Sequence, residues 1–161
     1  MDDANTPLEN SLIYIYDKEG HYLTEVITDK EGKCVFEVLP DTYLFKQIEG
    51  QPNHIIDDTL YRFKVDKDNR TFNSIITNER YKGRVAIQVK DKEDNPIEGF
   101  ECGIYDENKK LIVNLKTNEK GQMGAKNLPL GTYYYKLKGK KKYVEFQIKE
   151  KDETIVFNIE G

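Results

Sequence analysis

The chain is poor in the residue types that build metal centres, disulfide frameworks and catalytic triads. Its 161 residues include no Trp, two Cys, two His and two Met. Two Cys cannot form the dense disulfide framework of a small secreted domain. His21 and His54 lack a second His, a Cys or a carboxylate at ligand spacing, and neither has a plausible Ser or Cys nucleophile partner. We therefore expect no metal site, no cofactor and no enzymatic activity.

Long apolar runs and excess positive charge are also missing. No segment approaches the length of a transmembrane helix, and the first residues, MDDANTPLEN, are too polar for a signal peptide. The formal net charge of −4 argues against nucleic acid and anionic membranes as partners. If the protein acts outside the cell, we expect this chain to be one piece of a longer secreted protein.

The chain contains an internal repeat, in which one sequence pattern occurs twice. Pro7–Gln47 reads PLENSLIYIYDKEGHYLTEVITDKEGKCVFEVLPDTYLFKQ, and Pro96–Lys138 reads PIEGFECGIYDENKKLIVNLKTNEKGQMGAKNLPLGTYYYKLK. Identical residues keep one spacing through both segments: Pro7/Pro96, Glu9/Glu98, Ile15/Ile104, Tyr16/Tyr105, Asp17/Asp106, Thr28/Thr117, Gly32/Gly121 and Leu39/Leu128. A repeat of this length predicts two copies of one folding unit. We expect domains at residues 1–80 and 81–161, with the linker at Arg80–Gly83.

Short runs of alternating polarity, bounded by Asp, Asn, Gly and Pro, predict strands throughout both copies. In the first copy they are Leu12–Tyr16, Tyr22–Thr28, Lys33–Val38, Thr42–Ile48, Leu60–Val65 and Phe72–Thr77. In the second they are Arg84–Lys90, Phe100–Tyr105, Lys110–Lys116, Gln122–Asn127, Thr132–Lys138, Tyr143–Ile148 and Thr154–Ile159. With no helical period of any length, this pattern predicts an all-β fold of two tandem immunoglobulin-like sandwiches.

The first copy has one predicted strand fewer than the second, because it begins after the point where an opening strand would lie. In the second copy Val85, Ile87 and Val89 alternate with Ala86, Gln88 and Lys90 and would each contribute about 1.5–3 kcal/mol to a core. Domain stability is only about 5–15 kcal/mol. We therefore expect the first copy to be marginal or to borrow a strand, with an open sheet edge. The expected cause is that the sequence starts just downstream of a native strand.

The two cysteines fit the repeat as core residues. Cys34 falls opposite Met123, and Cys102 falls opposite Ile13, so each occupies a place that the other copy fills with an apolar side chain. A free Cys commonly packs this way. We expect no disulfide, because one would have to join the two domains.

The ordered motifs of the second copy resemble those of a known domain family. These motifs are Gly83-x-Val85-x-Ile87, Asn95-Pro96-Ile97-Glu98-Gly99, Ile104-Tyr105-Asp106, Thr117-x3-Gly121 and Leu128-Pro129-x-Gly131-Thr132-Tyr133. They are similar to the collagen-adhesin B-type (Cna B-type) domain of Gram-positive surface proteins, also called the SpaA-type pilin or prealbumin-like domain. The resemblance covers about residues 7–159, in two copies. It implies a seven-stranded sandwich that serves as a stalk or spacer module in adhesins and pili, without enzymatic turnover.

Many members of that family carry an internal isopeptide bond between a Lys on the first strand and an Asn on the last, helped by a buried acid. The resemblance places the Lys, acid and Asn positions of the second copy at Val89, Leu137 and Asn158. In the first copy the acid position falls on Gln47 and the Asn position on Asn78, and the Lys strand is absent. We expect all five positions to be unreactive, because the amine and the acid that must share a proton are missing.

Three short motifs resemble functional signals but fit solvated turns or a strand start better. Leu39–Tyr43 is similar to a sortase signal but lacks its Gly and the apolar span that follows. Asp66–Asn69 begins like a calcium loop without the required Gly and Glu. Lys138–Lys142 is a basic run at a predicted hairpin. The loop Glu49–Thr59, longer than its counterpart, is the first place to look for a ligand site.

Three functions fit these observations. The leading one is a stalk or spacer segment of a bacterial adhesin or pilin, extracellular on the cell surface or cell wall, whose partners are neighbouring domains of the same protein. The second is an adhesive module whose loops or Tyr-rich face engage host protein or carbohydrate. The third is an accessory domain of a secreted enzyme. The first two are distinguished by whether one group of rings is buried or exposed: Tyr14, Tyr16, Tyr133, Tyr134 and Tyr135.

Overall fold

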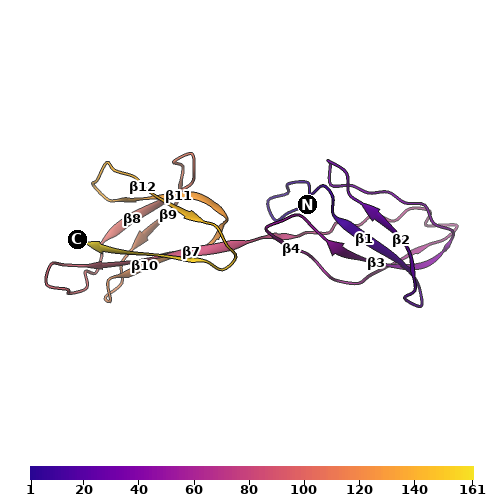
Figure 1. Ribbon diagram of the computed structural model, residues 1–161, viewed down its shortest axis with the longest axis horizontal. Helices are drawn as coiled ribbons and strands as arrows, with labels where there is room; N and C mark the ends of the chain where they lie inside the picture. Colours follow the sequence, from indigo (N-terminus) through magenta and orange to yellow (C-terminus); the bar gives the residue numbers. More distant parts are fainter. The chain divides into compact units, whose positions relative to one another are not determined.

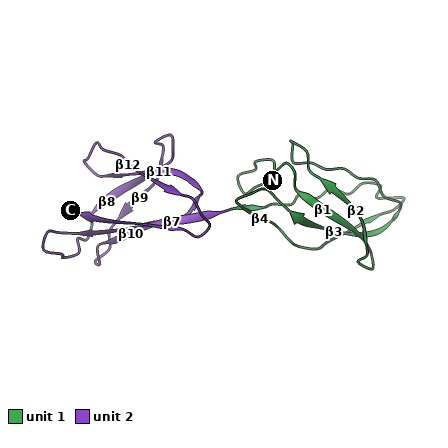
Figure 2. Ribbon diagram, viewed as in Figure 1, with its two compact units in different colours: residues 1–80 green, residues 81–161 purple.

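The computed structural model describes all 161 residues and contains thirteen strands and no helix. The predicted all-β fold is therefore confirmed. The chain divides into two compact units, Met1–Arg80 (unit 1) and Tyr81–Gly161 (unit 2), which are coloured separately in Figure 2. It contains no helix of the length and apolarity needed to cross a membrane.

Unit 2 is a complete sandwich of two sheets (Figure 1). A three-stranded sheet has the order β10-β7-β13, and a four-stranded sheet has the order β12-β11-β8-β9. The strand bounds are β7 Lys82–Lys90, β8 Glu101–Tyr105, β9 Leu111–Lys116, β10 Gln122–Pro129, β11 Gly131–Leu137, β12 Val144–Ile148 and β13 Thr154–Glu160. The central strand β7 pairs antiparallel with β10 on one edge and parallel with β13 on the other.

The core of unit 2 lies between these two sheets. Val85, Ile87 and Val89 of β7 are almost completely buried, because alternate side chains of a strand point to the same face. They pack against residues of the opposite sheet: Cys102, Ile104, Tyr133, Tyr135, Phe146 and Ile148. Cys102 is a core residue, as predicted.

Unit 1 keeps the four-stranded sheet of this sandwich but not the three-stranded one. Its sheet has the order β2-β1-β3-β5, formed by β1 Leu12–Asp17, β2 Tyr22–Ile27, β3 Asp41–Glu49 and β5 Tyr61–Val65. A separate two-stranded sheet joins β4 His54–Ile55 to β6 Glu79–Arg80. The buried hydrophobic cluster has four members, Ile13, Ile15, Phe45 and Phe63, where that of unit 2 has twelve. The smaller core agrees with the expectation that unit 1 is the less stable copy.

Two predicted strands of the first copy, Lys33–Val38 and Phe72–Thr77, are wrong: neither segment forms a strand. Their counterparts in unit 2 are β10 and β13, which are both hydrogen-bonded to β7 and not to each other. Unit 1 has no counterpart of β7, so the two segments have no strand between them to bond. A strand exists only as part of a ladder, and the local pattern alone cannot supply one.

The turns between strands follow from side-chain oxygens that bind nearby backbone groups. Asp106 Oδ1 accepts hydrogen bonds from the backbone N–H groups of Asn108 and Lys110, both at 2.9 Å. Asp17 makes the same pair of bonds after β1, at the equivalent place in the repeat. These are Asx turns, for which Asp and Asn are the preferred residues.

A buried threonine connects two loops in each unit. Thr117 Oγ1 donates to the carbonyl oxygen of Ile97 at 2.7 Å and accepts from the backbone N–H of Phe100 at 2.8 Å. Thr28 makes both bonds at the equivalent positions of unit 1. The hydroxyl thereby satisfies one donor and one acceptor of the chain segment that leads into β8, or into β1 in unit 1.

We predict that Thr117→Val lowers the free energy of unfolding of unit 2 by about 2 kcal/mol, because two backbone groups lose their partner. Chemical denaturation measures the change. Thr117→Ser is the matched control, since it keeps the hydroxyl, and it should cost less. Equal stability of the Val and Ser variants would contradict this role of the hydroxyl.

Candidate functional site

We call the positions that the family resemblance assigns to an isopeptide bond the crosslink-equivalent positions, and in unit 2 they do not all lie together. Val89 is 0% exposed, and Leu137 packs against the same core. Asn158 is exposed, because its neighbours Phe157 and Ile159 on β13 are the residues that face inward. The structure therefore brings Val89 and Leu137 into one apolar cluster and places Asn158 away from it.

The crosslink-equivalent positions of unit 1 do come together. Gln47 and Asn78 are each only 2% exposed. A Cβ placed on Gly50 would lie 2.9 Å from Gln47 Nε2 and 3.1 Å from Asn78 Nδ2, so the two amides meet at Gly50. Asn78 Oδ1 accepts a hydrogen bond from the backbone N–H of Asp57 at 3.0 Å. The pair consists of two neutral amides, which cannot exchange a proton as a carboxylate can.

Gln47 is only partly satisfied in this buried place. Its Nε2 donates to the carbonyl oxygen of Glu49 at 3.1 Å, but its Oε1 has no hydrogen-bond partner. A buried acceptor without a donor costs about 1–3 kcal/mol. At the equivalent position unit 2 has Leu137, which carries no such cost.

A charged cluster that the sequence analysis missed holds the first residues of the chain. Asp2 is buried, and its Oδ1 accepts from the backbone N–H groups of Ala4 and Thr6, both at 2.8 Å. Its Oδ2 lies 3.7 Å from His54 Nε2 and 3.9 Å from Arg80 Nε. Burial opposes ionisation of Asp2, but the backbone donors and Arg80 outweigh it and lower its pKa. The cluster ties the N-terminal loop to β4 and β6. Since the cluster depends on contacts between residues far apart in sequence, no local motif predicts it.

A groove of about 610 Å³ runs along one side of unit 1. One wall is Cys34–Val38 and the other is Arg70–Ser74 with Ile76, while Ile13, Phe45, Phe63 and Val65 form the floor. We call this feature the strand groove. Cys34, predicted as a core residue, is only half-buried here, and burial raises the pKa of its thiol.

The tyrosines divide between the core and the outer face of the four-stranded sheets. Tyr133 and Tyr135 are buried, whereas Tyr14, Tyr16 and Tyr134 are half-buried. The two buried rings are therefore core residues, and the other three rings are partly open to solvent.

On unit 2 the outer rings are covered by lysines. Lys136 Nζ lies 4.7 Å from the ring centroid of Tyr143 and 5.3 Å from that of Tyr105. Lys109 Nζ lies 5.5 Å from the ring centroid of Tyr134 and 5.3 Å from that of Tyr143. These are cation–π distances. We call these five residues the tyrosine–lysine patch.

The three short motifs that resemble functional signals form hydrogen bonds or ion pairs within the fold. Tyr43 donates its hydroxyl to the carbonyl oxygen of Leu39 at 2.8 Å, and Tyr133 repeats this bond with Pro129 at 2.6 Å. Asp66 Oδ1 accepts from the backbone N–H groups after it, so Asp66–Asn69 is a turn. Lys138 forms an ion pair with Glu101. No group of three His, Cys, Asp or Glu side chains is arranged to hold a metal ion.

Comparison with known proteins identifies the family of this chain. The family model described as SpaA, prealbumin-like fold domain, matches residues 1–80 and again residues 83–161. The chain therefore belongs to the SpaA prealbumin-like fold domain family and contains two copies of that domain. The resemblance drawn from the sequence motifs is confirmed. A search of the curated proteins gave no match.

The chain is also similar to several solved structures. The Bacillus anthracis TIE protein matches with a TM-score of 0.72 and 26% sequence identity over 99% of this chain and 32% of that protein. The chain thus spans about a third of the length of that relative. BcpA, the major pilin subunit of Bacillus cereus, matches at 11% identity, with a TM-score of 0.46, over 99% of this chain and 96% of that one. The minor pilin GBS52 of Streptococcus agalactiae matches at 17% identity, with a TM-score of 0.43, over 96% of this chain and 83% of that one.

We predict that Gln47→Leu raises the free energy of unfolding of unit 1 by about 1 kcal/mol, because it removes a buried acceptor that has no donor. The measurement is denaturant unfolding with unit 1 followed as its own transition. The mirror variant Leu137→Gln should destabilise unit 2, since it creates the same defect there. A loss of stability in Gln47→Leu would show that the amide is needed where it lies.

Proposed function

We propose that the chain is a structural stalk or spacer segment of a Gram-positive cell-surface adhesin or pilin. The observation that carries the proposal is the match of one pilin-type domain family to both halves of the chain. The expected location is the cell surface or cell wall, and the expected partners are neighbouring domains of the same protein. A chain that spans about a third of the TIE protein fits a segment of this kind.

The proposed stalk carries no internal isopeptide bond. In unit 2 this is supported by the apolar Val89 and Leu137 and by the exposed position of Asn158. In unit 1 it is supported by the amide at Gln47, which cannot serve as the acid that such a bond requires. Each unit would then resist force through packing and hydrogen bonds alone.

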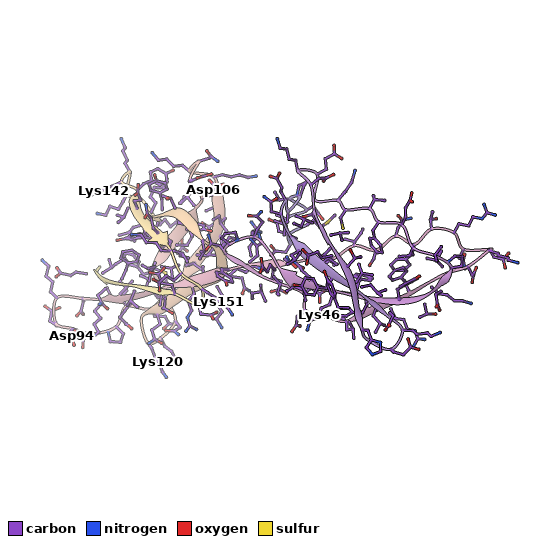
Figure 3. The ribbon with its side chains drawn as sticks, turned by 45° about the vertical axis from the view of Figure 1, so that its right-hand side comes forward. Lys46, Asp94, Asp106, Lys120, Lys142 and Lys151 are labelled. Atoms are coloured by element: carbon purple, nitrogen blue, oxygen red, sulfur yellow. The ribbon has the colours of Figure 1, made fainter.

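We also propose no enzymatic role for this segment. His21 Nδ1 lies 2.9 Å from Asp17 Oδ2 on an exposed turn, and His54 Nδ1 lies 2.9 Å from the carbonyl oxygen of Pro52. Burial raises the pKa of Cys102 to about 11, so this thiol stays protonated at neutral pH. Lys120 and Lys142 lie at turns of unit 2, where their side chains project away from the sandwich (Figure 3).

A second candidate is the adhesive module, and the tyrosine–lysine patch is the observation that favours it. Half-buried rings with polar tips are common at binding surfaces for proteins and sugars. The lysines that already cover these rings weigh against it, because a ligand would have to displace them. We therefore rank it below the stalk.

We predict that the intact, denatured protein has the mass of its sequence, without the loss of ammonia that an isopeptide bond causes. When unit 2 is unfolded by force, its roughly 80 residues should extend by about 25 nm. A bond between positions 89 and 158 would hold back most of that length. A mass deficit of one ammonia, or an extension of a few nanometres, would overturn this part of the proposal.

The role as a spacer predicts no saturable binding to immobilised collagen, fibrinogen or a glycan array. The matched variants are Tyr143→Ala in the patch and Tyr14→Ala on β1 of unit 1. Binding that Tyr143→Ala abolishes and Tyr14→Ala retains would replace the stalk with the adhesive module.

A further inference from the structure

The strand groove of unit 1 lies where unit 2 has a strand. Its walls are the segments equivalent to β10 and β13, and in unit 2 the strand between those two is β7. Cys34, Phe36 and Val38 alternate inward along one wall, as a strand would, although that wall is not part of a strand. The groove therefore keeps the side-chain pattern of a sheet whose central member is missing.

Two apolar side chains at the groove are strongly exposed to solvent. Val35 is 90% exposed and Ile75 is 71% exposed, each on a segment whose counterpart is a strand in unit 2. Such surface next to unpaired strand edges is a template for pairing with another strand. An extended peptide that bonds to both walls fits this chemistry, since main-chain hydrogen bonds provide affinity and alternate side chains provide specificity.

Met1 marks one end of the groove. Its amino group donates to the carbonyl oxygen of Ile76 at 3.1 Å, and its own carbonyl oxygen accepts from the backbone N–H of Asn78 at 3.0 Å. These two bonds form one rung of a parallel ladder. In unit 2 the carbonyl oxygen of Lys90, the last residue of β7, accepts in the same way from Gly161 at 2.9 Å. Met1 thus occupies the place of Lys90.

We propose that the strand groove is a strand-acceptor site, which takes one extended peptide segment joined to the amino group of Met1. The strand would run parallel to Phe72–Thr77 and antiparallel to Lys33–Val38, as β7 does with β13 and β10. Its chemistry is that of β7, with branched apolar side chains at alternate positions. This goes beyond the stalk role and does not depend on it, because it concerns how unit 1 is completed.

The direct link to Met1 follows from the direction of the chain. A segment that precedes Met1 continues the rung already formed with Ile76 and Asn78, so it reaches the groove without a connecting loop. Covalent linkage also removes most of the entropy lost when a separate peptide binds. These two reasons favour a linked strand over a strand from another molecule.

The test adds a copy of residues 82–89, KGRVAIQV, directly before Met1, so that Met1 keeps the place of Lys90 and the copied valines and isoleucine face the groove. The melting temperature of unit 1 should rise by about 10 °C or more, because three apolar side chains become buried. Labelling of the groove thiol Cys34 should slow by on the order of tenfold, since its opening to solvent becomes rarer. Cys102, buried in unit 2, is the internal control and should be equally unreactive with and without the addition.

Two variants of the added strand separate specific docking from a longer N-terminus. Asp in place of the isoleucine that copies Ile87 should abolish both effects, because that side chain faces the core. Asp in place of the glutamine that copies Gln88 should retain them, since Gln88 is not part of the core cluster. Neither change touches the residues of unit 1 itself, so its own folding is the same in both proteins.

The remaining arm supplies the same eight residues as a free peptide at equimolar concentration. Weaker protection of Cys34 by the free peptide than by the linked copy supports the proposal. Equal protection would overturn the assignment to a strand joined to Met1. No stabilisation by the linked copy, or equal stabilisation by both Asp variants, would overturn the acceptor site itself, and neither result would bear on the mass or force measurements.

Discussion

Strand β7 is hydrogen-bonded along both of its edges, to β10 on one side and to β13 on the other. It is therefore the only connection between the two outer strands of its sheet. Its side chains Val85, Ile87 and Val89 are buried against the opposite sheet, so the same strand also supplies the centre of the core. Both the ladder and the packing of unit 2 depend on this one element.

Unit 1 shows what the same sequence pattern becomes without that strand. The sheet formed by β1, β2, β3 and β5 remains, because its strands bond to one another and need no counterpart of β7. The opposite sheet is lost, and the two segments that would form it are left as the walls of an apolar groove. Hydrogen bonding in a sheet is shared between neighbours, and the removal of a central strand affects both sides at once.

The crosslink-equivalent positions differ in their chemistry between the two units. Val89 and Leu137 complete an apolar core in unit 2, whereas Gln47 and Asn78 form a buried amide pair in unit 1. Neither arrangement contains the charged groups that bond formation needs. The hydrogen bonds of one threonine and one tyrosine hydroxyl are the same in both units.

The sequence alone was enough to predict the repeat, the all-β fold, the family and most strand positions, because turn residues and alternating polarity act over a few neighbours. The family resemblance also assigned Val89, Leu137 and Gln47 to crosslink positions, and that assignment stays a prediction. Only the tertiary structure showed that Asn158 is exposed, that Gln47 and Asn78 both lie beside Gly50, and that Lys33–Val38 and Phe72–Thr77 do not form strands. The physical reason is that the direction of a side chain and the pairing of a strand depend on which strand lies alongside. That neighbouring strand is distant in the sequence, and unit 1 has none between Lys33–Val38 and Phe72–Thr77.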